Sequence, residues 1–403
     1  MTRNSHTPMA QFAARSERGW CDGAPRNAGG QEFTWSAGRW RALEGPVPSA
    51  LRSETEPLRG VERLLAEGAA PRAVLAATYE FGRRFDPLGH AFVAEEQDIL
   101  PELLLLLDEG GDESSPPPPS VNADTHLRST VGPSAHEAQV EAIRRLISAG
   151  DLYQANLAVP FRAVGTSSGR ELWERGLAYG GADFAAYLRA GDVEVVSFSP
   201  ELFVRVRGRR IETRPIKGTA RIGVGEGPED AGARLLASRK DRAEHLMIVD
   251  LERNDLGRVC EPGSVRVEPL FEVTVHPTLV HMESTVVGYL REGAGLHDVF
   301  AALFPGGSVT GAPKRRALEV IRDIERTPRG IFCGALGWVD ARGDFEFNLP
   351  IRTATRFADG TLLYPVGGGI VYDSVAADEW TELETKRAFM DRVLAAEGGR
   401  AGG

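Results

Sequence analysis

The chain has 403 residues, of which 42% are hydrophobic, so it can bury a core large enough for one large domain or two. Its formal net charge of −10 argues against a nucleic acid partner, because phosphate binding requires clustered lysine and arginine. Cys21, Cys260 and Cys333 are scattered along the chain, which fits no metal-binding pattern and suits reduced thiols in a cytosol.

The start of the chain lacks a charged segment followed by an apolar run, so we expect no signal peptide and a cytoplasmic location. The longest leucine-rich run covers residues 100–108, far fewer than the roughly 20 residues that span a bilayer. We therefore expect no membrane association and interpret this run as a buried helix.

Composition divides the chain into successive regions. The first 32 residues lack hydrophobic periodicity and predict a disordered leader. Residues 33–108 predict an N-terminal subdomain of strands and short helices, and residues 109–134, with four consecutive prolines, predict a surface linker. Residues 135–395 predict the main domain, and residues 396–403 predict a flexible tail.

Strands and helices are segregated in the main domain rather than strictly alternating. Apolar residues recur at helical spacing from Ser134 to Gly150, a glycine placed as a C-terminal cap. Residues 193–198 and 202–207 alternate like paired strands, and residues 231–251 and 314–325 are patterned as amphipathic helices. This segregation favours an α+β fold over a doubly wound sheet.

A lysine in the segment 211–219 is placed like a nucleophile. Lys217 follows an alternating apolar stretch and is predicted to lie in a loop between Pro215 and Gly218. Most isolated lysines are solvated surface residues. A lysine amine attacks carbon only when neutral, and apolar enclosure or a nearby cation such as Arg214 can favour that state.

Two pairs of carboxylates are spaced three residues apart on predicted helices. Asp241 and Glu244 share one helix face, and Glu379 and Glu382 repeat the spacing on the last helix, with Lys386 one turn further along. Such pairs often form only surface salt bridges. Carboxylates from two helices also suit Mg²⁺, which keeps several waters and completes its shell with substrate oxygens.

Several longer segments occur in a fixed order along the chain. They are residues 151–157, 198–203, 211–219, 241–258, 304–314, 349–353 and 367–373. Together they resemble the chorismate-utilising enzymes, which include anthranilate, isochorismate and salicylate synthases. Within that group they most resemble the aminodeoxychorismate synthase component I family, over about residues 130–395. The resemblance implies the anthranilate synthase component I-like fold, with large antiparallel sheets packed face to face and helices outside.

The resemblance also implies a role for individual residues. Glu244 and Glu382 match the family's magnesium ligands, with Asp241 and Glu379 holding waters or orienting them. Glu201 matches the general acid, although it could instead pair with Arg205 or Arg214. His281 matches a pocket histidine that orients substrate. The expected substrate-binding residues are Arg352, Gly218, Thr219, Ser308 and the glycines Gly367, Gly368 and Gly369, which would expose backbone N–H groups at a tight turn.

The reaction implied is the amination of chorismate at C4. Lys217 would add at C2 while the C4 hydroxyl leaves with a proton from Glu201, and ammonia would then replace the lysine by attack at C4. Anthranilate synthases resemble the chain closely but have alanine where Lys217 stands, and isochorismate and salicylate synthases have a base lysine where Ala155 stands. The alternatives are an anthranilate synthase component I and a non-catalytic relative that binds chorismate.

Ammonia must come from elsewhere, because no segment offers the glycine-flanked cysteine of a glutaminase. We expect a separate glutamine amidotransferase subunit as partner. A downstream aminodeoxychorismate lyase would remove pyruvate to give p-aminobenzoate, for folate synthesis or for a secondary metabolite.

Overall fold

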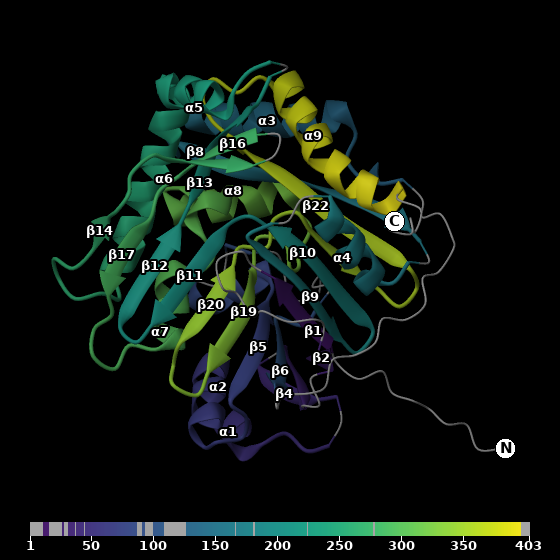
Figure 1. The fold of residues 1–403 in the computed structure, drawn as a ribbon, viewed down its shortest axis with the longest axis vertical. Helices are drawn as coiled ribbons and strands as arrows, with labels where there is room; N and C mark the ends of the chain where they lie inside the picture. Colours follow the sequence, from purple (N-terminus) through teal and green to yellow (C-terminus); the bar gives the residue numbers. More distant parts are fainter. Residues whose placement is uncertain are drawn as a thin grey trace.

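The computed structural model describes residues 11–15, 26–27, 31–36, 38–43, 45–86, 91–92, 100–108, 126–165, 167–179, 182–223, 225–276 and 279–395. Its α-helices are α1 (Ser49–Arg52), α2 (Pro57–Ala66), α3 (Pro133–Ser148), α4 (Gly169–Ala178), α5 (Pro228–Ala237), α6 (Arg239–Gly257), α7 (Leu296–Leu303), α8 (Lys314–Glu325) and α9 (Ala376–Ala395). Short 3-10 helices are η1 (Tyr79–Phe85) and η3 (Gly307–Val309). Figure 1 shows α1, α2, α3, α5, α6 and α9 around the outside of the strands, with α8 nearer the middle of the view.

Within the described ranges the strands form three antiparallel sheets. The first has the order β18 (Gly311–Ala312), β8 (Gln154–Val164), β22 (Thr361–Ile370), β21 (Thr353–Arg356), β10 (Val193–Ser199), β9 (Phe184–Ala190), β1 (Gln11–Arg15) and β2 (Arg26–Asn27), with β7 (Arg128–Ser129) also paired to β8.

The second sheet has the order β14 (Arg266–Val267), β17 (Val286–Tyr289), β12 (Arg210–Arg214), β11 (Leu202–Arg207), β20 (Phe345–Asn348), β19 (Ala335–Asp340), β5 (Arg72–Ala77), β6 (Leu103–Asp108), β3 (Glu32–Ser36) and β4 (Arg39–Ala42). The third consists of β13 (Ile216–Arg221), β16 (Leu279–Glu283) and β15 (Glu272–His276).

The two large sheets pack against each other through a shared apolar layer. Phe184 and Leu188 of β9 belong to the same buried cluster as Val74 of β5 and Leu104 of β6. Interdigitated side chains of facing sheets exclude water from the space between them. The predicted α+β fold with large antiparallel sheets is therefore confirmed.

The chain passes from one large sheet to the other between β10 and β11. These strands were predicted to pair, but β10 pairs with β9 and β21, whereas β11 pairs with β12 and β20. Only Pro200 and Glu201 separate them, and a tight hairpin of two residues favours Asn-Gly or Gly at these positions. The prediction was wrong because the alternation of apolar and polar residues indicates that a segment is a strand but not which strand it pairs with. The crossover between the two sheets positions Glu201.

The leucine-rich run is a strand rather than the predicted helix. In β6, Leu103, Leu105 and Leu107 join one buried cluster while Leu104 and Leu106 join another. A strand covered on both faces reads as a continuous apolar run, which periodicity alone does not distinguish from a buried helix.

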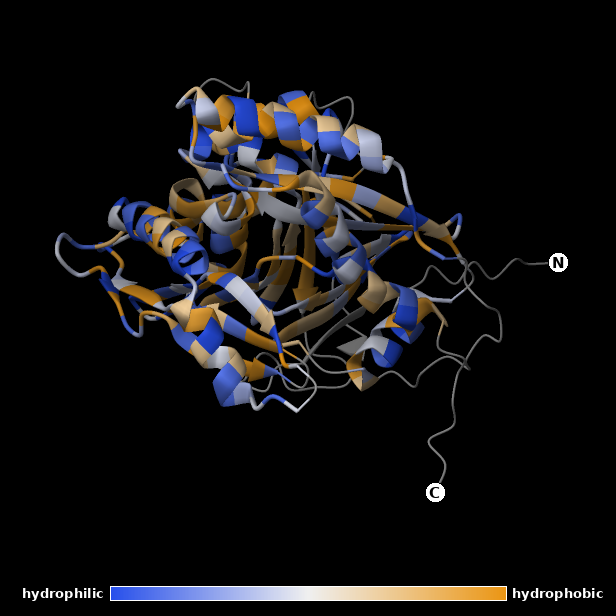
Figure 2. Ribbon diagram, turned by 90° about the horizontal axis from the view of Figure 1, so that it is seen from above, coloured by the Kyte–Doolittle hydropathy of each residue, from blue (hydrophilic) through white to orange (hydrophobic). Residues whose placement is uncertain are grey.

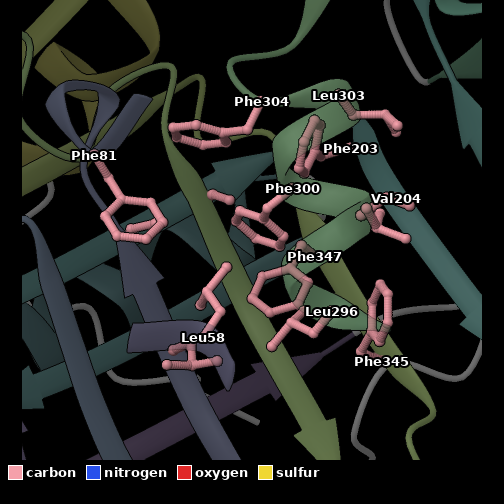
Figure 3. Packing of buried hydrophobic residues seen from close by; sticks show 14 of the residues in the cluster. Leu58, Phe81, Phe203, Val204, Leu296, Phe300, Leu303, Phe304, Phe345 and Phe347 are labelled. Atoms are coloured by element: carbon pink, nitrogen blue, oxygen red, sulfur yellow. The ribbon is translucent and has the colours of Figure 1, made fainter. Parts of the chain in front are cut away.

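The predicted N-terminal subdomain is part of the second sheet, because β5 pairs with β19 from the main domain. Figure 3 shows Leu58 and Phe81 packed in one core with Phe300 and Phe347. The Phe300 and Phe347 rings lie edge to face, with centroids 5.1 Å apart. Residues 33–108 and the main domain therefore share a core.

The ends of the predicted regions differ from the structure at several points. Gln11–Arg15 and Arg26–Asn27, inside the predicted leader, form strands that extend the edge of the first sheet. Helix α3 begins at Pro133, inside the predicted linker, since proline is favoured in the first helical turn. Residues 1–10, 16–25 and 28–30 of the leader, residues 109–125 of the linker and the tail at 396–403 lie outside the described residues.

The helix predictions hold for most of the main domain. Helix α8 has the predicted bounds, whereas the helix predicted at 231–251 is divided at Ser238, whose hydroxyl accepts the Asp241 N–H and caps α6. Figure 2 shows that the outer helices mix hydrophilic and hydrophobic residues, as amphipathic helices do. Within the described ranges, none of the helices could cross a bilayer.

Candidate active site

Glu201 lies buried at the crossover between the two large sheets. Its side chain is 4% exposed, and the Ser308 hydroxyl donates to its Oε1 at 2.5 Å. Burial raises the pKa of Glu201 to about 7, although the Ser308 hydrogen bond, the Lys217 charge and the Ile216 N–H act in the opposite direction. A carboxyl that holds its proton near neutral pH can serve as a general acid.

The alternative role of Glu201, an ion pair with Arg205 or Arg214, is absent from the described part of the chain. Arg205 and Arg214 both bind the Glu212 carboxylate, at 2.8 and 2.9 Å. The charge of Arg214 is thus neutralised by Glu212 of the same strand. Arg214 is therefore not the free cation that was expected to favour neutral Lys217. Glu201 keeps a carboxyl that no arginine shares.

Lys217 lies in a bulged strand rather than in the predicted loop. The register of β13 against β16 shifts between Ile216 and Thr219, and Gly218 inside the bulge has φ +84°. A bulge redirects the side chains around it, and the left-handed backbone favours glycine. Lys217 is 12% exposed, and its Nζ lies 3.3 Å from Glu244 Oε1.

The two predicted metal ligands are both held by lysines. Glu244 on α6 contacts Lys217 and accepts a hydrogen bond from Gln154 Nε2 at 3.0 Å. Glu382 on α9 lies 2.7 Å from Lys386 Nζ. Burial acts to raise the pKa of Glu382, but the charge and hydrogen bond of Lys386 outweigh it and lower the pKa.

The carboxylates of α6 and α9 approach the same stretch of β22. A Cβ added at Gly369 would lie 3.1 Å from Glu244 Oε1, and one added at Gly368 would lie 3.3 Å from Glu379 Oε2 and 3.9 Å from Glu382 Oε1. Figure 1 shows α9 beside β22. Carboxylates of two distant helices thus converge on two adjacent residues of β22. Lys217 connects them, because it contacts Glu244 and its charge lowers the pKa of Glu382.

Gly367, Gly368 and Gly369 are strand residues, so the predicted tight turn is wrong. They pair residue by residue with β8 along its first half. Strand glycines allow a close approach of other groups, which here are the carboxylates and the amide of Gln154. The carbonyl of Gly367 also accepts a hydrogen bond from Lys386 Nζ at 2.6 Å.

In the described part of the chain, no three or more His, Cys, Asp or Glu side chains form a metal-binding group. The convergence consists of Glu244 and Glu382, with Glu379 nearby; burial raises the pKa of Glu379. Asp241 lies beside Gly218: a Cβ added at Gly218 would be 3.3 Å from the Cβ of Asp241. Two carboxylates with open positions match Mg²⁺ better than a closed protein cage.

His281 and Thr219 lie opposite each other on β16 and β13. The Thr219 hydroxyl and His281 Nδ1 form a hydrogen bond of 2.8 Å. Burial lowers the pKa of His281 to about 3, and the charges of Arg352 and Lys386 add to the effect. His281 is therefore neutral at physiological pH and can orient a substrate through hydrogen bonds.

Arg352 precedes β21 with a left-handed backbone, φ +50°. Burial lowers the pKa of its guanidinium, and among the described residues it has no ion-pair partner. Arg352 is half-buried, and a half-buried cation without a counter-ion carries a desolvation cost that a substrate carboxylate would offset. The predicted residues Arg352 and His281 are thus brought together with Lys386 on one side of the site.

Gln154 lies in segment 151–157, one of those that carry the family resemblance, but no role was predicted for it. Its side chain packs over Gly369 and fixes Glu244 through its amide. Local sequence could not reveal this contact, because Gln154 and Glu244 are far apart in the chain. The only available signal was the position of Gln154 within segment 151–157.

Gly369→Ala is expected to lower kcat/KM at least about ten-fold, because the methyl group would displace Gln154 and disturb Glu244. Steady-state kinetics and urea denaturation would measure the effect. Gly257→Ala is the control, since nothing lies within 4 Å of its Cβ position. Normal kinetics in Gly369→Ala would contradict the assigned role of this glycine.

Residues 52–392 match the family of chorismate binding enzymes. The chain is 38% identical over 256 residues to aminodeoxychorismate synthase component 1 of Bacillus subtilis (strain 168), an alignment that covers 63% of this chain and 54% of that protein. It is 39% identical over 273 residues to anthranilate synthase component 1 of Aquifex aeolicus (strain VF5), with 67% and 55% covered. The chain thus spans about half the length of these relatives.

The solved structure of anthranilate synthase component I from Streptococcus pneumoniae TIGR4 has the same fold. It matches with a TM-score of 0.77 at 24% identity, over 94% of this chain and 92% of that chain. Because the family match extends from residue 52 to residue 392, across both large sheets and every residue of the site, the protein belongs to the chorismate binding enzymes.

Proposed function

We propose that the protein aminates chorismate at C4 with ammonia, giving 4-amino-4-deoxychorismate. The observation that carries this proposal is the pairing of an amine and an acid in one site. The Ile216 N–H donates to the Glu201 carboxyl, and the next residue is Lys217. A nucleophile and a general acid on adjoining groups suit a reaction that exchanges one substituent for another.

The reaction has two steps. Lys217 in its neutral form attacks C2 of the ring, the double bonds shift, and the C4 hydroxyl takes the proton of Glu201 and leaves as water. Ammonia then attacks C4, the electrons return, and the C2–N bond breaks. The lysine nitrogen becomes a cation when the C2–N bond forms, and its proton passes to the Glu201 carboxylate, which restores the acid. In the second step the proton released by the incoming ammonia returns to the lysine nitrogen as the C2–N bond breaks, so Lys217 and Glu201 are both regenerated.

The substrate's two carboxylates need cationic partners. Arg352 has no ion-pair partner among the residues that the structure describes, and a planar guanidinium can bind a carboxylate through two parallel hydrogen bonds. His281, neutral and held by Thr219, is placed to orient a polar group of the ring. Such fixed partners supply the proximity that makes attack at one carbon efficient.

Mg²⁺ is the cofactor we propose. Glu244 and Glu382 fit it, because both carboxylates lie beside adjacent glycines of β22 and both interact with the charge of Lys217. When bound, the ion would anchor a substrate carboxylate and draw negative charge toward it. Lys217 and Lys386, which now pair with these carboxylates, would exchange those partners for others.

Ammonia is proposed to come from a separate glutamine amidotransferase subunit. The name of the Bacillus subtilis relative, component 1, supports a second component. A downstream aminodeoxychorismate lyase is proposed to release pyruvate and give p-aminobenzoate. The alternative is an anthranilate synthase component, favoured by the Aquifex aeolicus relative of similar identity.

Incubation of the purified protein with chorismate, MgCl₂ and ammonium chloride at pH 8 tests the proposal, with products resolved by liquid chromatography and mass spectrometry. We expect an aminated chorismate that retains its pyruvyl group and yields p-aminobenzoate when a lyase is added. Anthranilate would show that ammonia attacks C2 and would support the alternative. Chorismate that binds but is not consumed would indicate a non-catalytic relative.

A further inference from the structure

A short turn connects Glu201 to a second buried carboxyl. The turn is η3 with its neighbours, residues 306–310, and Ser308 at its centre donates to Glu201 at 2.5 Å. The preceding residue, Gly307, donates its N–H to Glu252 Oε1 at 3.1 Å. Glu252 comes from α6, so one helix fixes the backbone beside the hydroxyl that binds the acid.

Glu252 is enclosed as tightly as Glu201. It is 3% exposed, and its Oε2 has no hydrogen-bond partner among the described residues. Burial raises the pKa of Glu252 to about 8; the Lys314 charge opposes this shift, while Asp255 and Glu201 add to it. Lys314 forms an ion pair with Asp255 at 2.5 Å, so its charge does not outweigh the burial of Glu252. The raised pKa favours the neutral acid form of Glu252 near pH 7.

The other end of the turn is held independently. Arg329 donates to the Val309 carbonyl at 3.0 Å, and the Thr310 carbonyl accepts the Asn156 N–H at 2.7 Å. At the Gly307 end, the Thr310 hydroxyl of the turn itself donates to the Gly306 and Gly307 carbonyls at 2.9 and 3.3 Å. Glu252 is the side chain from outside the turn that binds this end, through the Gly307 N–H next to Ser308. Without it, that end loses its acceptor while the far end stays anchored.

We propose that Glu252 is a positioning residue for the general acid: by holding the Gly307 N–H it keeps the Ser308 hydroxyl on Glu201. The inference rests on the proposed function, in which Glu201 supplies a proton to the leaving hydroxyl. Glu252 touches neither substrate nor reacting atoms, and it acts through the turn. Its role requires an acceptor oxygen rather than a charge.

This role has a signature in the pH dependence. The groups that act on Glu201 are Ser308, Lys217 and the Ile216 N–H, which lower its pKa, and Glu283, which raises it. Buried Cys333 and Glu252 itself also lie within electrostatic range, and a charged Glu252 would raise the pKa of Glu201, so its removal alone would move the limb to lower pH. Loss of the Ser308 hydrogen bond removes one lowering contribution. The alkaline limb of kcat/KM, where Glu201 loses its proton, is then expected to move to higher pH.

Three variants test the inference: Glu252→Leu, Glu252→Gln and Ser308→Ala. Glu252→Leu is expected to lower kcat about ten-fold with little change in KM, and to move the alkaline limb upward as Ser308→Ala does. Glu252→Gln restores the acceptor, so its kcat and pH profile should return to those of the wild type. The double variant of Glu252→Leu and Ser308→Ala should lose no more than the worse single variant.

A merely structural role for Glu252 would lower kcat without moving the alkaline limb, and that result would overturn the inference. An equally impaired Glu252→Gln would do the same. Rates are followed as chorismate loss, so anthranilate formation would overturn the proposed product and leave this inference standing. If the wild type consumes no chorismate, the proposed function fails, and crystal structures decide the inference: an unchanged Ser308–Glu201 hydrogen bond in Glu252→Leu would refute it, and a broken one would support it.

Discussion

Lys217→Ala is expected to lower kcat for C4 amination at least about 10³-fold, because the covalent route loses its nucleophile. The bulge of β13 and the left-handed Gly218 hold the backbone around this position, so the alanine should be accommodated without a change of fold. Steady-state kinetics with ammonium as nitrogen donor, together with circular dichroism and urea denaturation, would measure both properties.

Two lysine variants control for charge. Lys217→Arg keeps a cation beside Glu244 but has no nucleophilic amine, so it should be as inactive as the alanine variant. Lys240→Ala removes an exposed lysine that acts on the α9 carboxylates from α6, and it should retain most activity. If Lys217→Arg kept wild-type kcat, the role of Lys217 would be electrostatic rather than covalent.

The covalent intermediate can be observed directly. Wild-type protein quenched during turnover without ammonia should carry, on the peptide containing Lys217, the mass of chorismate minus one water. Lys217→Ala should carry no such adduct. Full C4 amination by Lys217→Ala in the absence of added primary amine would exclude the covalent route.

The sequence predicted the helical carboxylates because their geometry is local. Glu244 on α6 and Glu382 on α9 lie on the faces expected from a spacing of three to four residues. Their convergence above β22 was not predictable from that spacing. It depends on how β22 pairs with β8, and on glycines whose missing side chains leave room for both carboxylates.

The environment of Glu201 shows the same limit. The residue itself stood out in the segment 198–203, and the general acid role requires a raised pKa, which the buried crossover provides. Its donor, Ser308, lies 107 residues away, and no local pattern connects the two. The prediction that 193–198 pairs with 202–207 was wrong for a related reason: the partner of a strand depends on the packing of the whole sheet and not on its own sequence pattern.

Glu201→Gln is expected to lower kcat about 10²- to 10⁴-fold, the usual contribution of a general acid. In the wild type the acid is protonated below a pKa of about 7, so kcat/KM should fall as pH rises above that value. Glu283→Gln is the control: it removes a carboxylate that raises the pKa of Glu201, so the alkaline limb should move to lower pH while the variant keeps most of its activity. A wild-type profile without an alkaline limb near pH 7 would contradict the assignment.

Glu201→Gln is expected to raise the free energy of unfolding at pH 8 although it lowers activity. The folded-state pKa of Glu201 lies above the unfolded value of 4.5, so folding takes up a proton and stability falls as pH rises from 4.5 to about 7. Glutamine removes this penalty, and Glu201→Gln should be more stable than the wild type at pH 8 by up to about 3 kcal/mol, with little difference near pH 4. Urea denaturation at both pH values measures it. An inactive variant that is more stable places the defect in proton transfer, whereas an inactive variant that is less stable at pH 8 would mean that Glu201 supports the fold as an ionised group.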